Sequence, residues 1–546
     1  MEGCAPQEKL HFGATMTPIP PSSLHFPSRK ATLPTSLAVG ALVALAAFCG
    51  LPAHADVKLA DIFSDHMVLQ REIPVPVWGE AAPQEEVTVS FRNGVKTTRA
   101  GADGKWRIAL DPLQAGGPDE LRVKGNNTVV FKDVLVGEVW VGSGQSNMAG
   151  GAGGYAKNDE ELAKLLAAAP YPQIRLARAK GGWQEATADK ANGFSALLFS
   201  FGVQLREKLN VPVGLIVGAV GGTPSGAWLS QAAFDADEKS QRLIQEYGKI
   251  YPEQLKAYEE KALPAWEKAV SEAKAEGKKE PNKPNPPSAP GMVWGKEPGY
   301  LYEPFIRPFV GYGIRGVLWD QGESGTGLGF VDQHTLMGAL IRGWRKEWGI
   351  GDFPFLYVQK PSGGGCAWDP NNPVTRQSEP FGPLPPVVPA MNPGVEMHIR
   401  IMNYPNTAMV ISSDLGSGIH PTNKSGYGSR AAQVALGTAY KQPLEYYGPV
   451  YASHTIEGNK VRIQFTHVGK GLTFRHGEKL QGFAIAGADK KFVWANASIE
   501  GNAVVVSNPA VAQPAAVQYA LAADRRWANL FNQDGLPAVP FRTDAP

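Results

Sequence analysis

Residues 139–148 read VWVGSGQSNM, and the interpretation of the whole chain starts from this stretch. Its apolar beginning is typical of a buried β-strand, and the small residues that follow predict a tight turn. Such a turn would expose the hydroxyl of Ser146 with backbone N–H groups beside it, which is the geometry of a nucleophilic serine. Ordinary loops have a similar composition, so the rest of the chain must decide between these two interpretations.

Two further strands end in turns of the same kind. VGLIVG at 213–218 leads to Gly221 and Gly222, whose N–H groups could approach a developing negative charge. IRGVL at 314–318 leads to WDQGES at 319–324. Because sites in α/β proteins form at the carboxyl ends of strands, we expect these turns and Ser146 to share one site.

A histidine lies in a Gly/Ser/Pro-rich loop farther along the chain. His420 belongs to DLGSGIHP at 414–421, and residues 423–430 lead into an Ala/Leu-rich helical segment. An imidazole with a pKa of about 6.5 can both accept and return a proton near neutral pH. We therefore expect Ser146 to attack an ester carbonyl and His420 to act as general base and then general acid.

The chain resembles the sialate O-acetylesterase-like branch of the SGNH hydrolases, which are carbohydrate acetylesterases. The matching stretches are GEVW at 137–140, SGQSNM at 143–148, GGT at 221–223, QGES at 321–324, IHP at 419–421 with Lys424, DHMVLQ at 65–70, GLP at 535–537 and PFRTD at 540–544. The resemblance implies an α/β fold with a flavodoxin-like three-layer α/β/α core, flanked by N- and C-terminal β-sandwich-like regions.

The resemblance also implies three donors to the oxyanion formed during acyl transfer. They are the N–H of Ser146, the N–H of Gly222 (or Gly221) and the side-chain amide of Gln321. Each such donor contributes on the order of 3 kcal/mol to transition-state stabilisation. Gln145 and Glu323 are expected to bind substrate. No cofactor is expected, and no metal, because no cysteine or histidine cluster has metal-ligand spacing.

The acid that would orient His420 departs from the family pattern. Many SGNH enzymes carry an aspartate three residues before the histidine, where this chain has a serine. Asp414, six residues before the histidine, is our first candidate for the orienting acid. Glu323 and Asp320 are alternatives if their turn faces the imidazole. A backbone carbonyl near Gly418 is a fourth possibility.

Residues 1–55 are expected to be a cleaved leader. A basic pair at 29–30 precedes an apolar run at 37–51, and AHA at 53–55 offers a small-x-small cleavage site. The run is short and contains glycine, which favours a signal peptide over a membrane anchor. Export to the periplasm or the extracellular space follows, with no membrane span in the mature chain.

Charge and cysteine content exclude other classes. The chain has 53 Lys and Arg against 51 Asp and Glu, a net charge of +2, which gives no electrostatic case for nucleic acid or an anionic membrane as partner. Two of its three cysteines lie in the expected leader, so Cys366 is left alone. An internal disulfide is then impossible, and the fold must rest on its core.

Strand and helix patterns divide the remaining chain into three regions. Short alternating strands at 56–134 predict an N-terminal β-sandwich domain. Strands alternate with helices at 135–441, which predicts the esterase domain, with a charged helical excursion at 231–291. Strand signals return at 442–546 and predict a C-terminal β domain. The Gly/Pro-rich segment 361–393 reads as a long loop that shapes the substrate pocket.

We therefore expect an exported serine esterase that releases acetate from an acetylated carbohydrate through an acyl-enzyme. O-acetylated sialic acid is the first candidate substrate, and acetylated xylan or another acetylated glycan is the alternative. A glycan-binding relative that has lost catalysis is the second class of function. The joint presence of Ser146, His420, Gly222 and Gln321 favours the enzyme.

Overall fold

The fold is organised around one long strand, β8 (Thr128–Gly144), in a computed structural model that describes residues 56–366 and 369–544. Its first half pairs with β7 (Gly116–Lys124) and β2 (Val68–Gln70), and its second half lies between the parallel strands β11 and β12. The predicted boundary between the N-terminal domain and the esterase domain, at residues 134 and 135, lies inside this strand. The N-terminal strands and the α/β core therefore share β8, and one hydrophobic core runs through both.

The core is a largely parallel sheet with strand order β10-β9-β11-β8-β12-β13-β14. Its other strands are β9 (Tyr171–Arg178), β10 (Trp183–Ala186), β11 (Val213–Ala219), β12 (Gly316–Asp320), β13 (Phe355–Val358) and β14 (Thr407–Val410). All run parallel except β10, which pairs antiparallel with β9 at the edge. The core is thus of the α/β class, as predicted.

Five consecutive parallel strands of the sheet have the flavodoxin order 2-1-3-4-5 that the resemblance implied: β11, β8, β12, β13 and β14 are the second, first, third, fourth and fifth of them along the chain. Strands β9 and β10, which come between β8 and β11 in the sequence, extend this sheet beyond β11. The burial of β11 and β9 fits these places. β11 is buried along nearly its whole length, whereas β9 begins with partly exposed residues and suits a place nearer the edge.

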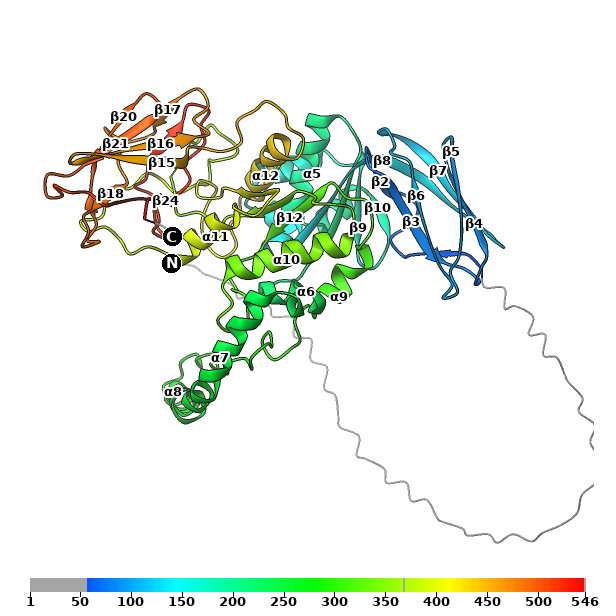
Figure 1. The fold of residues 1–546 in the computed structure, drawn as a ribbon, viewed down its shortest axis with the longest axis horizontal. Helices are drawn as coiled ribbons and strands as arrows, with labels where there is room; N and C mark the ends of the chain where they lie inside the picture. Colours follow the sequence, from blue (N-terminus) through cyan, green and yellow to red (C-terminus); the bar gives the residue numbers. More distant parts are fainter. Residues whose placement is uncertain (1–55, 367–368, 545–546) are drawn as a thin grey trace, which may run out of the picture. The chain divides into compact units, whose positions relative to one another are not determined.

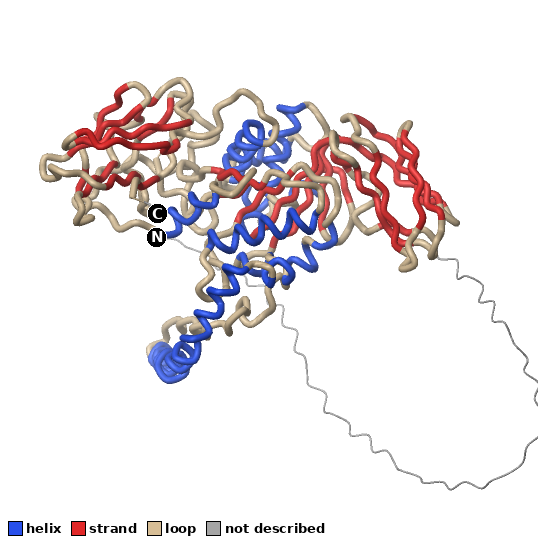
Figure 2. The backbone as a smooth tube through the Cα atoms, in the orientation of Figure 1, coloured by secondary structure: helices blue, strands red, loops and turns tan. Residues whose placement is uncertain are grey.

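Helices cover both faces of this sheet (Figures 1 and 2). On one face α5 (Ala196–Leu209) packs beside α12 (Lys424–Thr438), and the ring of Trp140 on β8 meets Phe201 of α5. On the other face α10 (Gln333–Trp348) packs its Trp344 against Trp319 of β12. Helix α10 begins at Gln333 because the side chain of Asp332 caps it.

Shorter helices connect these elements. They are α1 (Ser146–Ala149), α2 (Ala152–Tyr155), α3 (Glu160–Ala167), α4 (Ala188–Gly193), α6 (Gln231–Asp235), α9 (Tyr302–Phe305) and α11 (Pro393–Ile401), with 3-10 turns at Ser225–Trp228 and Arg307–Phe309.

The segment 231–291, predicted as a charged helical excursion, contains α7 (Glu238–Ala257) and α8 (Leu263–Ala275), which project from the rest of the fold in Figure 1. The proline-rich return packs back on them, since Tyr247 donates to the Ser288 carbonyl and Trp266 to the Pro281 carbonyl. Among the residues described, every helix is too short or too polar to span a bilayer.

Strand-rich regions precede and follow the α/β core. The N-terminal strands are β1 (Lys58–Leu59), β3 (Val75–Glu80), β4 (Glu86–Phe91), β5 (Gly94–Arg99) and β6 (Lys105–Leu110), together with β2 and β7. The C-terminal strands are β15 (Val450–Glu457), β16 (Lys460–Thr466), β17 (Leu472–Phe474), β18 (Phe483–Ala486), β19 (Val493–Trp494), β20 (Asn496–Glu500), β21 (Ala503–Ser507), β22 (Ala516–Tyr519), β23 (Leu530–Asn532) and β24 (Phe541–Arg542). The latter strands have a hydrophobic core of their own.

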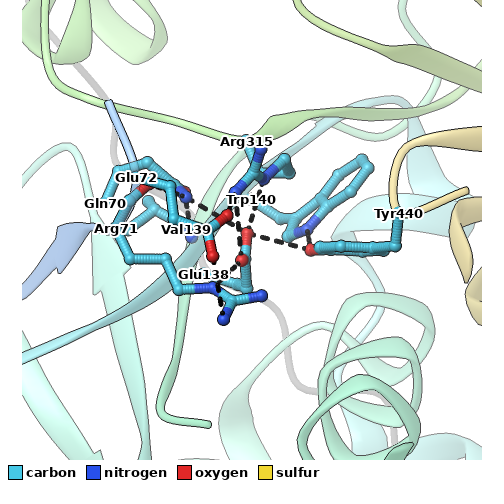
Figure 3. A network of polar contacts seen from close by, with 8 residues as sticks. All are labelled: Gln70, Arg71, Glu72, Glu138, Val139, Trp140, Arg315 and Tyr440. Atoms are coloured by element: carbon cyan, nitrogen blue, oxygen red, sulfur yellow. Dashed lines mark hydrogen bonds and ion pairs between the residues drawn. The ribbon is translucent and has the colours of Figure 1, made fainter. Parts of the chain in front are cut away.

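A buried acid anchors the middle of β8 (Figure 3). The carboxylate of Glu138 is fully buried and accepts hydrogen bonds from the guanidinium groups of Arg71 and Arg315. Gln70 and the hydroxyl of Tyr440 donate to the same carboxylate, at 3.1 and 3.0 Å. We call these residues the Glu138 cluster. It ties β8 to the N-terminal strands, to the segment before β12 and to the residues after α12.

Candidate active site

The carboxyl ends of β8, β11 and β12 lie side by side. In the register of the sheet, Gly144 of β8 pairs with Ala219 of β11 and with Asp320 of β12. The turns that follow these three strands therefore meet at one edge of the sheet, as the sequence predicted.

Gly144 explains how the chain leaves β8. Its φ of +127° lies in the region that favours glycine, and a Cβ there would lie 2.1 Å from the carbonyl oxygen of Asp320. The N–H of Gln145 donates to that same oxygen at 2.9 Å. Strand β8 therefore closes tightly on β12 before the chain turns into α1, whose first residue is Ser146.

The fold brings Ser146 and His420 together across 274 residues of sequence. The Nε2 atom of His420 lies 2.8 Å from the Oγ atom of Ser146. His420 lies in an exposed loop between β14 and α12, and Ser146 is half-buried. A serine and an imidazole at this distance can exchange a proton directly.

Asp414 does not contact His420, so the prediction that it orients the imidazole is wrong in this structure. The Asp414 side chain is fully buried, and its two oxygens accept hydrogen bonds from Arg430 of α12, at 3.0 and 2.7 Å. A buried carboxylate is stable only when it is paired, and the guanidinium satisfies it with a bidentate contact. The residue therefore fastens the start of its loop to α12.

The two alternative acids also have other partners. Asp320 and Glu323 both lie beside the ammonium group of Lys360, at 2.6 and 2.7 Å. Within residues 56–366 and 369–544, His420 makes one hydrogen bond, and its partner is Ser146. Neither acid, nor a carbonyl near Gly418, therefore contacts the Nδ1 atom.

Three backbone N–H groups stand free near the serine hydroxyl. A Cβ built on Gly221 would lie 3.4 Å from the Cβ of Ser146, so the turn after β11 borders the serine. Gly222 is exposed and has a φ of +70°. In the described residues, the N–H groups of Ser146, Gly221 and Gly222 have no acceptor within the chain. Such donors are available to a negatively charged oxygen.

Gln321 is not available as an oxyanion donor, which corrects the prediction made for its side chain. The side chain is fully buried, and its Nε2 atom donates to the carbonyls of Thr223 and Gly325, at 3.3 and 2.9 Å. Its Oε1 atom accepts from Ser225 and from Gln333. The amide instead links the turn after β11 to the turn after β12.

The structure also turns Gln145 away from any substrate. Its side chain is 2% exposed; its Nε2 atom donates to Glu323 and its Oε1 atom accepts from Ser324 at 2.8 Å. Glu323 differs, because its side chain is 20% exposed. Of the two residues predicted to bind substrate, Glu323 alone reaches the surface of the site.

The turn that carries Ser146 contacts a group of charged and polar side chains, which we call the Lys360 cluster: Asp320, Lys360, Lys424 and Asn147, which are buried, and Glu323, which is partly exposed. Burial raises the pKa of Asp320 and lowers the pKa of Lys424 to about 7. Burial would also lower the pKa of Lys360, but the two neighbouring carboxylates raise it above its ordinary value. Among the residues described, the carboxylate of Asp320 has no hydrogen bond of good geometry, although the Lys360 ammonium lies 2.6 Å away.

Sequence reasoning missed Lys360 and Asn147 as members of the site. A signal was present for both. Lys360 follows the end of β13, so the rule that sites form at strand ends applies to it as it does to Gln321. Asn147 is the neighbour of Ser146 in the turn that the sequence singled out.

A cleft of about 460 Å³ adjoins the site at Glu323. Its walls include Glu323, Thr326, Gln333, Lys360, Asn392 and His398. The ends of the predicted loop 361–393 contribute to these walls, in keeping with its expected role in shaping a pocket. A larger hollow, of about 610 Å³, lies on strands β1, β3 and β6, and none of the residues that surround Ser146 lines it.

Known proteins similar to this chain are esterases. The family described as "carbohydrate esterase, sialic acid-specific acetylesterase" matches residues 136–261. The human sialate O-acetylesterase is 27% identical over 482 residues, which are 79% of this chain and 80% of the relative; the enzyme of Pongo abelii is 26% identical over the same length. A solved carbohydrate acetylesterase from Xanthomonas citri is 30% identical, with a TM-score of 0.68 over 90% of this chain and 100% of that one.

Proposed function

Since the chain belongs to the carbohydrate acetylesterases related to sialate O-acetylesterase, we propose that it hydrolyses O-acetyl esters of a sugar with Ser146 as nucleophile and His420 as base. The observation that carries this proposal is the distance of 2.8 Å between Ser146 Oγ and His420 Nε2. Free N–H groups beside the hydroxyl support it, because acyl transfer needs donors where negative charge develops.

In the first half of the reaction, His420 removes the proton of the Ser146 hydroxyl while the oxygen attacks the acetyl carbonyl carbon. The N–H groups of Ser146, Gly221 and Gly222 receive the oxyanion. His420 then gives its proton to the departing sugar oxygen, and the acetyl group remains on the serine.

In the second half, a water molecule replaces the sugar. His420 accepts a proton from this water, which attacks the acetyl carbonyl, and the same N–H groups bind the second oxyanion. Collapse of this intermediate returns the proton to Ser146 and releases acetate.

The sugar that we propose is an O-acetylated sialic acid, the substrate named for the curated relatives. The cleft at Glu323 supports a sugar subsite there, because polar side chains line it and Glu323 accepts a hydrogen bond from Asn147, the neighbour of Ser146.

We also propose an SGNH-type three-layer α/β/α core, flanked by N- and C-terminal β-sandwich-like regions. Residues 1–55 lie outside the described residues; we propose that they form a signal peptide and that the mature enzyme acts in the periplasm or outside the cell.

The proposal is tested by acetate release from 4-nitrophenyl acetate and from O-acetylated sialic acid. We expect the full chain to hydrolyse both esters and Ser146→Ala to lose activity by roughly four orders of magnitude or more. Ser417→Ala is the matched control, since this exposed serine makes no hydrogen bond among the residues described, and it should keep wild-type rates. A wild-type protein inactive on both esters would contradict the function, and activity in Ser146→Ala would contradict the mechanism.

A further inference from the structure

The loop that carries His420 is weakly held by its own contacts. Gly416 and Gly418 both have a φ of +92°, and Ile419 is 68% exposed. In the described parts of the chain, residues 417–420 make two hydrogen bonds, through the carbonyl of Ile419 and through His420 Nε2. Both lead to the turn of the nucleophile, and no acid holds the other side of the imidazole.

Asn147 makes the first of these bonds. It directly follows the nucleophile, is 1% exposed, and donates from Nδ2 to the Ile419 carbonyl at 3.0 Å. The same nitrogen donates to Glu323 Oε1 at 3.1 Å. One side chain thus connects the nucleophile turn to the backbone of the residue before His420.

Lys424 fixes the orientation of this amide. Its Nζ atom donates to Asn147 Oδ1 at 2.7 Å. The Lys424 amine serves as a hydrogen-bond donor here, so the Asn147 amide oxygen must face it and the amide nitrogen must face Ile419. If the amide were flipped, its nitrogen would face the Lys424 amine and its oxygen would face the Ile419 carbonyl oxygen. The contact with Lys424 therefore determines the contact with Ile419.

Lys424 is itself held rigidly. It is the first residue of α12 and is 1% exposed. Its Nζ atom lies 4.6 Å from the ring centroid of Tyr155 and 5.4 Å from that of Tyr427. The lysine therefore stands in a closed, aromatic setting, and Asn147 is its hydrogen-bond acceptor among the residues described.

We propose that Asn147, oriented by Lys424, is a positioning residue that takes the place of a triad acid: it holds the Ile419 carbonyl and thereby keeps His420 Nε2 against Ser146 Oγ. A triad acid orients the imidazole through its second nitrogen. Here the constraint acts on the backbone one residue earlier. This inference rests on the proposed Ser–His chemistry and deepens it.

The test uses 4-nitrophenyl acetate, a small ester that does not depend on sugar contacts. Asn147→Asp keeps the shape and an acceptor for Lys424 but cannot donate to Ile419, and Asn147→Ala removes both contacts. We expect kcat to fall roughly 10- to 100-fold in each, because small misplacements of a catalytic group cost about this much. KM should stay within about threefold of wild type, since an imidazole that acts only in the chemical step does not hold the ester.

A double-variant cycle separates positioning from general damage. If Asn147 acts through His420, then Asn147→Ala combined with His420→Ala should be no slower, within about twofold, than His420→Ala alone. Losses that add in the double variant would overturn the inference, because they would show a role independent of the histidine.

Lys424→Met provides a second variant, at a residue outside the nucleophile turn. It should lower kcat in the wild-type background. Combined with His420→Ala, it should be no slower, within about twofold, than His420→Ala alone. Thr422→Ala is the matched control, because Thr422 follows His420 in the same loop but bonds to Gln377, away from the serine; its kcat should match that of wild type.

The outcomes distinguish this inference from the function on which it rests. An active wild type whose Asn147 variants keep wild-type kcat overturns the inference and leaves the esterase intact. A wild type that hydrolyses no acetyl ester and whose Ser146 does not react with a fluorophosphonate overturns both.

Discussion

The Glu138 cluster and the Lys360 cluster are both groups of largely buried charged residues at the same sheet. They differ in how completely hydrogen bonds pair their charges. Glu138 is a single acid that accepts from two guanidinium groups, an amide and a hydroxyl, so none of its oxygens lacks a partner. In the Lys360 cluster, Asp320 is an acid with poor hydrogen bonds, and burial lowers the pKa of Lys424 to about 7.

The difference follows the roles of the two places. A fully paired buried charge resists change, which suits the segment of β8 where three parts of the chain join. Unsatisfied buried groups and shifted pKa values are costly, and proteins retain them mainly where chemistry needs them. The Lys360 cluster includes Asn147, the neighbour of Ser146, so its shifted pKa values agree with the proposed site.

The largest effect should come from Lys360→Met. The change leaves the buried Asp320 and the partly exposed Glu323 without their cation, so the free energy of unfolding should fall by about 4 kcal/mol. The kcat on 4-nitrophenyl acetate should also fall at least about tenfold, since Glu323 fixes Asn147. Urea unfolding and initial rates measure the two effects.

Lys346→Met, an exposed lysine near the end of α10, is the matched control and should change neither quantity. A Lys360→Met protein as stable as wild type would mean that Lys360 contributes no more to the free energy of unfolding than a residue of an exposed ion pair does.

Glu138→Gln should affect stability alone. Arg71 and Arg315 would lose their buried acid, and we expect a loss of about 3 kcal/mol in the free energy of unfolding. The kcat of the folded protein should stay within about twofold of wild type, because no group of this cluster reaches the serine.

Glu72→Gln tests whether burial sets the size of this loss in stability. Glu72 contacts the same two arginines, but its side chain is 46% exposed. Its loss should cost less than about 1 kcal/mol. Equal losses in the two variants would show that burial does not set the strength of the Glu138 cluster.

The pH dependence of stability should separate Lys424 from ordinary lysines. Its pKa is lowered by burial from 10.5 to about 7 in the folded chain. Between these values the unfolded chain binds the extra proton, so the stability of wild type should rise with pH relative to Lys424→Met. The difference in unfolding free energy should grow by about 2 kcal/mol from pH 7.5 to 9.5.

Urea unfolding of both proteins across this range gives the slope, with Lys346→Met as the reference. A flat difference would mean that Lys424 keeps its proton in the folded chain, as a cation paired with acids does in the Glu138 cluster, and the contrast between the clusters would disappear.

The parts of the site that depend on strand direction could be predicted from the sequence. The carboxyl ends of parallel strands share an edge, so apolar runs ending in VWVGSG and VGLIVG suffice to place Ser146 beside Gly221 and Gly222. The place of the extra strands β9 and β10 at the edge of the sheet could not be predicted in this way, because strand direction does not determine which edge an added pair joins.

The direction of each polar side chain could not be predicted, because it is set by partners that are distant in sequence. Gln321 turns inward since Ser225 and Gln333 offer it a buried network. Asp414 turns to Arg430, sixteen residues later in the chain. The bond of Asn147 to Ile419 spans 272 residues, and no local pattern announces it.

Asp414→Asn should leave the rate close to that of wild type. Replacing the acid of a Ser–His–Asp triad by its amide lowers kcat about 10⁴-fold, because the imidazole is then held in the wrong tautomer. Asp414 is instead bound to Arg430, so kcat/KM on 4-nitrophenyl acetate should stay within about threefold of wild type while the free energy of unfolding falls. A loss of several hundredfold would restore Asp414 as the orienting acid and remove the need for Asn147. A near-normal rate together with slow Asn147 variants would instead place the orientation of His420 in the backbone contact at Ile419.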